Sequence, residues 1–365
     1  MDRQPAPPGD ARAWLDVDLD AIRRNARRLA VHSGTRLTPV VKADAYGLGA
    51  GAVANALVGE SPWGFAVATV SEGIALREAG IGHPVLVCPP VLPAEYAAAS
   101  AARLTLSLGR SADVEQWHAA GGAAWHLSID TGMSRAGVRW DEVATMQGAA
   151  ARWAPEGVFT HFLAAERGEP SMVAQEVRFR EALAQLPVRP ALVHAENSAA
   201  ATRRTPSGYD MVRSGVFLYG VGSGPGALIE PEPAVTLRAR VTDLHRVERG
   251  ESVSYDAAWT AHAPRRIATV SLGYADGYCR ALGNRAHMLL DGRRVSVVGY
   301  VTMDMAMIDV TDVPCEVGDT VTVLGADGDD VITVEELSAL VPFSPYELLT
   351  GFHLRLTRRY RGRGA

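Results

Sequence analysis

The sequence predicts an α/β fold, with an N-terminal (β/α)8 barrel followed by a C-terminal all-β domain. From about residue 13 to residue 219, short apolar runs alternate with helix-like segments, which is typical of a parallel sheet covered by helices. After a glycine-rich stretch at residues 220–226, segments rich in Val and Thr alternate with turns, which favours antiparallel strands. A chain of 365 residues is long enough for two such domains.

The expected domains are residues 12–228 for the barrel and residues 229–365 for the β domain. Residues 1–11 are polar and proline-rich, lack the apolar core of a signal peptide, and are expected to form a disordered tail. The net charge of −5 argues against a nucleic-acid partner. No apolar run is long enough to span a membrane. Three cysteines without CxxC spacing indicate free thiols and no metal site. We therefore expect a cytoplasmic protein.

Eight apolar runs are the expected barrel strands. They are Thr38–Lys42, Gly64–Ala68, Pro84–Cys88, Arg103–Leu108, Ala124–Ile129, Gly157–His161, Ala191–His194 and Met211–Arg213. Helices that begin with a Ser or Asp suited to N-capping are expected between them, at Ser71–Ala79, Ser111–Ala120, Asp141–Ala151 and Ser171–Gln185. Periodicity alone leaves a doubly wound open sheet as an alternative. Polar residues at carboxyl strand ends favour the barrel, because that face carries the active site in such folds; these residues are Lys42, Asp130, His161 and Arg213.

The β domain is expected to contain short strands separated by prolines and Asp-Gly or Gly-Asp turns. The strand candidates are Val235–Val241, Arg266–Leu272, His287–Leu290, Arg294–Val298, Met305–Val310 and Thr320–Leu324. One short helix is expected at about Thr333–Ala339.

The segment PVVKADAYGLG, residues 39–49, carries the first catalytic candidate. An apolar run ends in Lys42, and a glycine-punctuated turn containing Tyr46 follows. A lysine in an apolar setting loses proton affinity and suits Schiff-base chemistry with a carbonyl cofactor. Considered alone, Lys42 is better interpreted as a strand-end lysine whose ammonium group reaches water.

Further motifs accompany this lysine along the chain. They are DTGMSRAG at residues 130–137, FTHF at 159–162, HAENSAA at 194–200, MVRSGVFLYG at 211–220, VSY at 253–255, GYADG at 273–277 and Met303-Asp304. Together with VVKADAYGLG, these motifs resemble the bacterial alanine racemases, which depend on pyridoxal 5'-phosphate, over nearly the whole chain.

The resemblance implies specific roles for these residues. Lys42 would hold the cofactor covalently and act as a base on one face of the substrate, and Tyr255 would act on the opposite face. The implied cofactor-binding residues are Lys42, Tyr46, His161, Asn197, Ser198, Arg213, Gly215 and Val216. Arg135, Tyr274 and Met303 are the implied substrate-binding residues. Tyr255 and Met303 would come from a second subunit, which implies a homodimer with shared active sites.

Arg213 carries a mechanistic implication. An arginine that faces the pyridine nitrogen cannot surrender its proton, so that nitrogen stays unprotonated. The ring is then a weaker electron sink, and quick reprotonation at Cα is favoured over side reactions.

The sequence also departs from the family. Many members carry a carbamylated lysine that anchors the arginine of the DTGM segment, whereas this chain has Ser128. A serine cannot form a carbamate, so Arg135 requires a chloride ion or a carboxylate. Tyr300, Thr302 and Leu354 also replace residues frequent in the family, which indicates a divergent pocket.

The expected function is therefore that of a pyridoxal-phosphate-dependent amino-acid racemase. Alanine is the leading candidate for its substrate. One alternative is a broad-specificity or biosynthetic racemase or epimerase acting on serine or another amino acid. A second is a non-catalytic protein that binds pyridoxal phosphate, although the β domain with Tyr255 argues against it.

Overall fold

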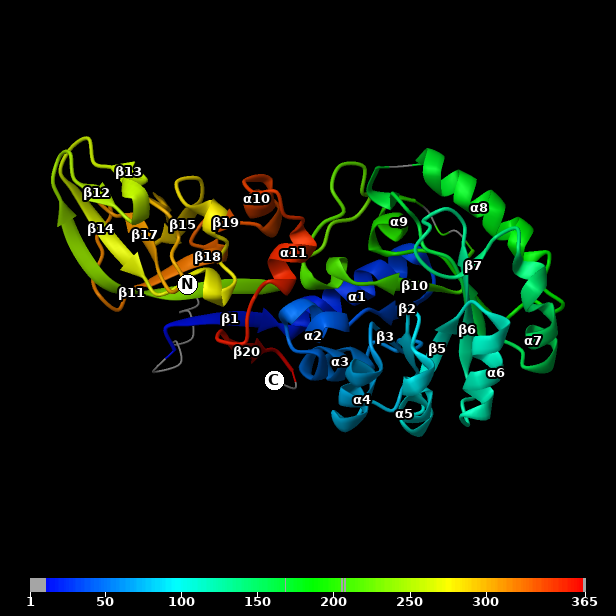
Figure 1. Cartoon of the computed structure of the whole chain (residues 1–365). Helices are drawn as coiled ribbons and strands as arrows, with labels where there is room; N and C mark the ends of the chain where they lie inside the picture. Colours follow the sequence, from blue (N-terminus) through cyan, green and yellow to red (C-terminus); the bar gives the residue numbers. More distant parts are fainter. Residues whose placement is uncertain (1–10, 168, 205, 207, 364–365) are drawn as a thin grey trace. The chain divides into compact units, whose positions relative to one another are not determined.

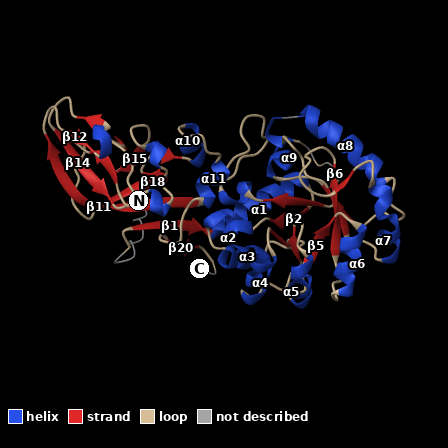
Figure 2. Ribbon diagram, in the orientation of Figure 1, coloured by secondary structure: helices blue, strands red, loops and turns tan. Residues whose placement is uncertain are grey.

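The computed structural model describes residues 11–167, 169–204, 206 and 208–363. Within these residues the chain forms two compact units (Figure 1). The barrel unit is Leu19–Glu232, and the β unit combines residues 11–18 with Pro233–Arg363. Helices alternate with strands in the barrel unit, and strands dominate the β unit (Figure 2). Residues 1–10 of the expected tail lie outside the described part of the chain.

The barrel unit contains a closed ring of parallel strands, as predicted. Six strands pair in sequence order: β3 (Phe65–Val67), β4 (Val85–Val87), β5 (Thr105–Leu108), β6 (Trp125–Asp130), β8 (Gly157–Phe159) and β9 (Leu192–His194). β2 (Arg36–Pro39) pairs in parallel with β10 (Met211–Ser214). Isolated bridges join this pair to both ends of the six, between Val40 and Ala66 and between Asn197 and Arg213. The closed ring rules out the open doubly wound sheet.

Helices follow most of these strands. They are α1 (Leu19–Ser33), α2 (Lys42–Gly47), α3 (Ala50–Val58), α4 (Val70–Glu78), α5 (Tyr96–Ala101), α6 (Ser111–Ala119), α7 (Gln147–Arg152), α8 (Glu169–Leu183) and α9 (Ser198–Arg203). The helix expected at Asp141–Ala151 is instead a 3₁₀ turn (Val143–Met146) followed by α7. A short strand, β7 (Val138–Arg139), pairs with the end of β6.

The β unit is built on one long strand, β11 (Val235–Val247). Its first half pairs with β1 (Ala13–Asp18) and β18 (Thr320–Asp327), and its second half pairs with β14 (Arg265–Val270). The other strands are β12 (Ser252–Val253), β13 (Trp259–Thr260), β15 (His287–Leu290), β16 (Arg293–Ser296), β17 (Ala306–Asp309), β19 (Asp330–Ile332) and β20 (Thr357–Arg361). Two helices, α10 (Val334–Ala339) and α11 (Pro345–Thr350), accompany them. A bulge after Val241 lets β11 pass from one set of partners to the other.

The position of β1 differs from the predicted domain division, which assigned residues 12–18 to the barrel. β1 pairs antiparallel with β11 and parallel with β20. The buried carboxylate of Asp16 explains this placement, because it forms ion pairs with three arginines of those strands, Arg238, Arg359 and Arg361. A strand that carries a buried acid is held where cations surround it.

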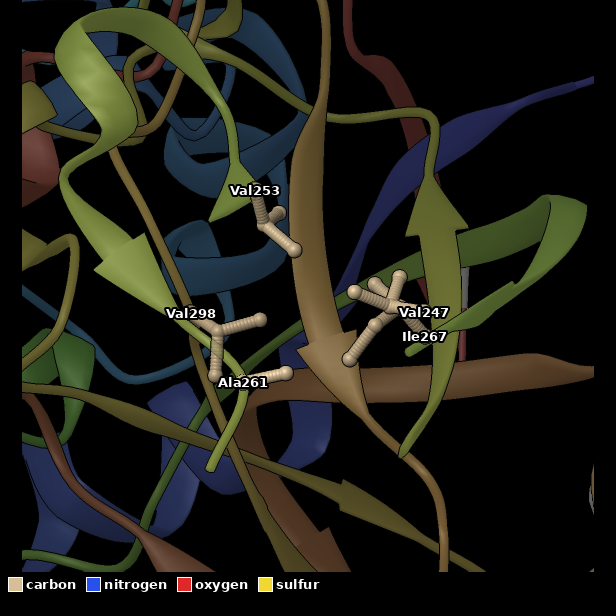
Figure 3. Close-up of a cluster of buried hydrophobic side chains, with 5 residues drawn as sticks. All are labelled: Val247, Val253, Ala261, Ile267 and Val298. Atoms are coloured by element: carbon tan, nitrogen blue, oxygen red, sulfur yellow. The ribbon is translucent and has the colours of Figure 1, made fainter. Parts of the chain in front are cut away.

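A cluster of buried apolar side chains includes residues from both sides of the β12–β13 hairpin (Figure 3). It contains Val247, Val253, Ala261, Ile267 and Val298. Val253 stands two residues before Tyr255, so the cluster anchors the segment that presents this tyrosine. Among the described residues, no helix has both the length and the apolar composition needed to cross a membrane.

Candidate active site

Lys42 lies at the mouth of the barrel, just beyond the carboxyl end of β2. The sequence predicts an apolar setting, but the Lys42 side chain is exposed. The reason is that pairing with the sheet continues only to the bridge between Val40 and Ala66, and Lys42 begins the turn that follows. Residues 43–46 all have positive φ angles, between 50° and 56°, and form a left-handed turn. Such a conformation costs about 1–2 kcal/mol for each L-residue, so other contacts must stabilise it.

Two carboxylates stabilise the left-handed turn. The Glu72 carboxylate accepts hydrogen bonds from the backbone N–H of Ala43 at 2.7 Å and of Ala68 at 2.7 Å. Glu72 also completes the capping box of α4 with Thr69. At the other end of the turn, the Asp44 carboxylate accepts the Ala50 N–H at 2.7 Å. The segment that follows Lys42 is therefore tied to α4 and to α3.

Tyr46 lies beside the backbone of Gly215. A Cβ atom added to Gly215 would stand 2.4 Å from the Tyr46 hydroxyl oxygen. The Tyr46 ring packs against Tyr219 with ring centroids 5.0 Å apart. Burial raises the pKa of Tyr219, whose hydroxyl donates to the Val40 carbonyl at 2.8 Å. Gly215 is therefore required because the Tyr46 hydroxyl occupies the space of a side chain.

Ser198 and Asn197 lie on the same side of the barrel mouth. The Gly215 N–H donates to Ser198 Oγ at 3.1 Å, and Ser198 Oγ lies 3.2 Å from Ser214 Oγ. Asn197 accepts the Ala200 N–H at 3.0 Å and so caps α9. Val216 begins the 3₁₀ turn Val216–Tyr219 directly after Gly215. Hydroxyls and backbone N–H groups therefore converge here, as an anion requires.

Arg213 is buried at the carboxyl end of β10, with 5% of its surface exposed. Its Nη1 donates to His194 Nδ1 at 2.6 Å, and its Nη2 donates to the carbonyls of Thr160 at 2.7 Å and Ala195 at 3.1 Å. Burial lowers the pKa of Arg213 to about 10, a shift that the nearby Cys88 and Glu196 oppose. Its guanidinium therefore remains charged near neutral pH. Within the described residues, no carboxylate makes a hydrogen bond or an ion pair with it.

His161 lies 3.4 Å from Arg213, measured from Nδ1 to Nη2. Burial, and then the charges of Arg213, Arg135 and Lys42, lower the pKa of His161 to about 3. The ring is therefore neutral at physiological pH. Lys42, Arg135 and Arg213 therefore all lie close enough to His161 to act on its charge.

Arg135 follows a tight turn after β6. The Asp130 carboxylate accepts the N–H groups of Gly132, Met133 and Ser134 at 2.9–3.1 Å. Ser128 is buried beside Gly137, where an added Cβ atom would stand 2.9 Å from Ser128 Oγ. Arg135 itself is exposed, and no carboxylate in the described chain pairs with it. The turn is thus held by Asp130, whereas the guanidinium has no protein anion.

Some supporting residues carry no signal in the sequence. Gln175, on α8, donates to Thr131 Oγ1 and to the His161 carbonyl, both at 3.0 Å, and accepts the Leu163 N–H. It thereby joins the segment after β6 to the segment after β8. The sequence indicates only a free thiol at Cys88, which is half-buried just after β4. Burial raises the pKa of this thiol, and the charges of Arg213, Lys42 and Arg135 oppose that rise. No motif marked Gln175, because a helical glutamine is common.

The second group of predicted residues lies in the β unit. Tyr255 is 67% exposed and lies between Ser254 and Asp256, which both have positive φ angles. Ser254 Oγ donates to the Tyr300 carbonyl at 2.8 Å, and Arg280 stacks over the Tyr300 ring at 4.0 Å. The loop therefore projects Tyr255 outward from a defined backbone.

Tyr274 and Met303 belong to the same part of the β unit. The Tyr274 N–H donates to the Thr302 carbonyl at 3.0 Å, and the Ala275 N–H donates to the Met303 carbonyl at 2.9 Å. Both side chains are exposed, by 40% and 54%. Hydrogen bonds thus join the two segments, and Tyr300 connects them to the Tyr255 loop. Leu354 is also exposed.

Two family models match the chain and together cover most of it. Residues 17–223 match the alanine racemase N-terminal domain, and residues 234–360 match the alanine racemase C-terminal domain. The chain therefore belongs to the alanine racemase family.

Individual relatives support the same assignment. The alanine racemase of Symbiobacterium thermophilum is 41% identical, with 96% of this chain and 98% of that protein covered. An alanine racemase structure from a D-cycloserine-producing Streptomyces lavendulae has a TM-score of 0.91 at 30% identity, covering 98% of both chains. One from Bartonella henselae, with covalently bound pyridoxal phosphate, has a TM-score of 0.87 at 28% identity, covering 96% of this chain and 100% of that one. A histidine racemase from Leuconostoc mesenteroides has a TM-score of 0.88 at 27% identity, covering 97% of this chain and 99% of that one.

Proposed function

We propose that the protein is a pyridoxal-phosphate-dependent racemase that interconverts L- and D-alanine. The single observation that carries the proposal is Arg213, a charged guanidinium buried among neutral imidazoles and carbonyl oxygens. A donor without an acidic partner suits an unprotonated ring nitrogen, which can only accept. The family assignment supports the same function.

The residues at the barrel mouth fit this cofactor. Lys42 would hold it covalently, and Tyr46, Asn197, Ser198, Gly215 and Val216 would surround its phosphate. His161 would pack near its ring, and Arg213 would face its nitrogen. The close approach of Tyr46 to Gly215 leaves backbone and hydroxyl groups available where a side chain would otherwise stand. When bound, pyridoxal phosphate withdraws electrons from the substrate Cα and makes the proton there acidic.

Two bases would then move this proton. Lys42 Nζ would remove or return it on one face of Cα, and Tyr255 Oη would do so on the other. Inversion requires both, because removal and return from one face restore the same enantiomer. Arg135 would bind the substrate carboxylate through its guanidinium, with Tyr274 and the Met303 backbone beside it. Tyr255 and Met303 would come from a second copy of the chain in a cytoplasmic homodimer.

A racemase acting on another amino acid is the second candidate. Ser128 favours it, as does Arg135, which is exposed and has no carboxylate partner among the described residues, because both alter the part of the site expected to bind the substrate carboxylate. One structural relative is a histidine racemase, which shows that this fold accepts different substrates.

Two measurements test the proposal. Borohydride reduction of the purified protein, followed by peptide mapping, should place the cofactor on Lys42. A screen of the common amino acids for exchange of the Cα proton with deuterium should show alanine as the fastest. Label on another lysine would exclude the Lys42 assignment. Label on Lys42 without exchange of any amino acid would favour a binding protein instead.

A further inference from the structure

A line of buried polar side chains leads from Arg213 through the interior of the barrel. Arg213 Nη1 contacts His194 Nδ1 at 2.6 Å, and His194 Nε2 contacts His126 Nδ1 at 2.9 Å. His126 Nε2 then lies 3.8 Å from Glu156 Oε2. Both rings are fully buried, whereas the Glu156 side chain is 37% exposed. Glu156 precedes β8, so this line ends at the amino end of the barrel, opposite the candidate active site.

The order of donors along this line follows from Arg213. A guanidinium can only donate, so His194 Nδ1 must accept. A neutral His194 then carries its proton on Nε2 and donates to His126 Nδ1. A neutral His126 in turn carries its proton on Nε2, directed at Glu156. Burial lowers the pKa of both rings, which agrees with neutral imidazoles.

The far end of the line requires an acceptor. His126 Nε2 is buried without a hydrogen-bond partner, and an unsatisfied buried donor is costly. The Glu156 carboxylate is the nearby anion, and its half-exposed side chain can rotate toward the ring. No other carboxylate of the described residues contacts His126 or His194.

Other groups also act on the charge of Arg213. Cys88 and Glu196 favour its charged form, and Arg135 opposes it.

We propose that Glu156 and His126 are positioning residues for Arg213. The carboxylate orients His126, His126 orients His194, and His194 holds the guanidinium at the barrel mouth. Each hydrogen bond in such a chain polarises the next. The substrate would not touch this relay, so the relay acts on the chemical step and not on substrate binding. The expected effect on the chemical step rests on the proposed function. The protonation states of His126 and His194 do not, because they follow from contacts within the chain.

Nitrogen-15 NMR of the histidine-labelled protein tests the ring states, with and without cofactor. We expect His126 and His194 to be neutral at pH 7 and protonated on Nε2. Glu156→Gln should shift the His126 ring signals more than those of His194. Glu60→Gln is the matched control, because Glu60 lies at the same end of the barrel but pairs with Arg27, and it should shift neither.

Kinetics test the positioning role. Glu156→Gln should lower kcat about fivefold, the difference between a charged and a neutral hydrogen-bond partner, with KM for alanine nearly unchanged. Glu156→Asp, which keeps the charge, should recover part of the loss, and it also serves as the second variant if Glu156→Gln folds poorly. A charged ring, an Nδ1-protonated ring, or ring signals unmoved by Glu156→Gln would overturn the relay. A protein that binds no cofactor would contradict the proposed function but leave the ring measurement valid.

Discussion

At the scale of single residues, the contact between Gly215 and Tyr46 makes a direct prediction. Gly215→Ala places a Cβ atom 2.4 Å from the Tyr46 hydroxyl oxygen, so the tyrosine must move. Overpacking of this kind costs about 1–3 kcal/mol. If the strain falls on the bound state, cofactor affinity drops about fivefold to 150-fold. Titration of the cofactor-free protein, followed by absorbance, measures this loss.

A matched glycine provides the control for this change. A Cβ atom added to Gly82 would have no neighbour within 4 Å, and Gly82 has no positive φ angle, so Gly82→Ala should leave affinity unchanged. Adding Tyr46→Phe to Gly215→Ala should restore little of the lost cofactor affinity, because the added Cβ atom would also stand 3.0 Å from the Tyr46 Cζ atom, which phenylalanine keeps. Normal affinity in Gly215→Ala would show that Tyr46 and Gly215 do not contribute to the cofactor site.

Arg135 leads to a second residue-scale prediction. Since Ser128 cannot carry a carbamate and no described carboxylate pairs with Arg135, we expect a chloride ion beside this guanidinium. A charge-assisted partner is worth about 1.5–3 kcal/mol. Racemisation should therefore be faster in chloride than in a bulky inert anion at equal ionic strength, and Ser128→Lys should weaken this difference. Equal rates in both salts would remove the chloride and favour a carboxylate outside the described contacts.

At the scale of elements, the left-handed turn after β2 depends on α4. Glu72 accepts hydrogen bonds from Ala43, beside Lys42, and from Ala68 and Thr69 at the start of α4. Glu72→Gln keeps the shape but removes the charge, and should destabilise the protein by about 1–2 kcal/mol. Urea unfolding measures this change, and borohydride labelling of Lys42 should become slower.

The same helix offers a control for Glu72. Glu78 is exposed at the end of α4, and its side chain makes no hydrogen bond or ion pair among the described residues, so Glu78→Gln should change neither stability nor labelling. A Glu72→Gln protein with unchanged stability would show that the turn is held by other contacts, such as the Asp44 carboxylate.

The elements also show what the sequence could predict. Apolar runs identified all eight barrel strands, because burial on both faces leaves few polar residues in them. The left-handed turn at residues 43–46 is not predicted by the sequence, since Ala and Tyr show no local preference for it and a single Asp does not predict four such residues in a row. The position of β1 was missed for a different reason: its partners lie more than 200 residues away, and a period-2 pattern does not reveal its partner. The motif residues of the barrel lie at or just beyond strand ends, whereas Glu72 and Gln175 belong to no motif and act through tertiary contacts.

At the scale of the whole molecule, the buried histidines make stability depend on pH. Burial lowers the pKa of His126 and of His194 in the folded state. Below the ordinary pKa of about 6.5, the unfolded chain binds protons that the folded chain does not. Stability is therefore lost as pH falls, by up to about 1.4 kcal/mol per pH unit for each ring. Urea midpoints between pH 7 and pH 5 should fall, and a constant midpoint would contradict neutral buried rings.

The proposed homodimer can be tested by mixing two variants, each of which lacks one of the two bases. Lys42→Ala should abolish the proton transfers on one face, and Tyr255→Phe should impair the two directions of racemisation unequally. If each site takes Lys42 from one chain and Tyr255 from another, mixed dimers contain one intact site. After subunit exchange, an equal mixture should recover about a quarter of wild-type activity. No recovery, with exchange demonstrated by a tagged chain, would mean that both bases come from one chain.

The pairing of β1 with β11 and β20 has a consequence for synthesis on the ribosome. β1 is made before the barrel, but its partners follow the whole barrel, and Asp16 can meet Arg359 and Arg361 only once those residues have also been made. At about 5–20 residues per second, this apolar strand with its acidic group waits on the order of ten seconds or longer. The barrel can fold during that interval, while β1 still lacks its partner strands. Completion of the β unit therefore comes after synthesis of the barrel.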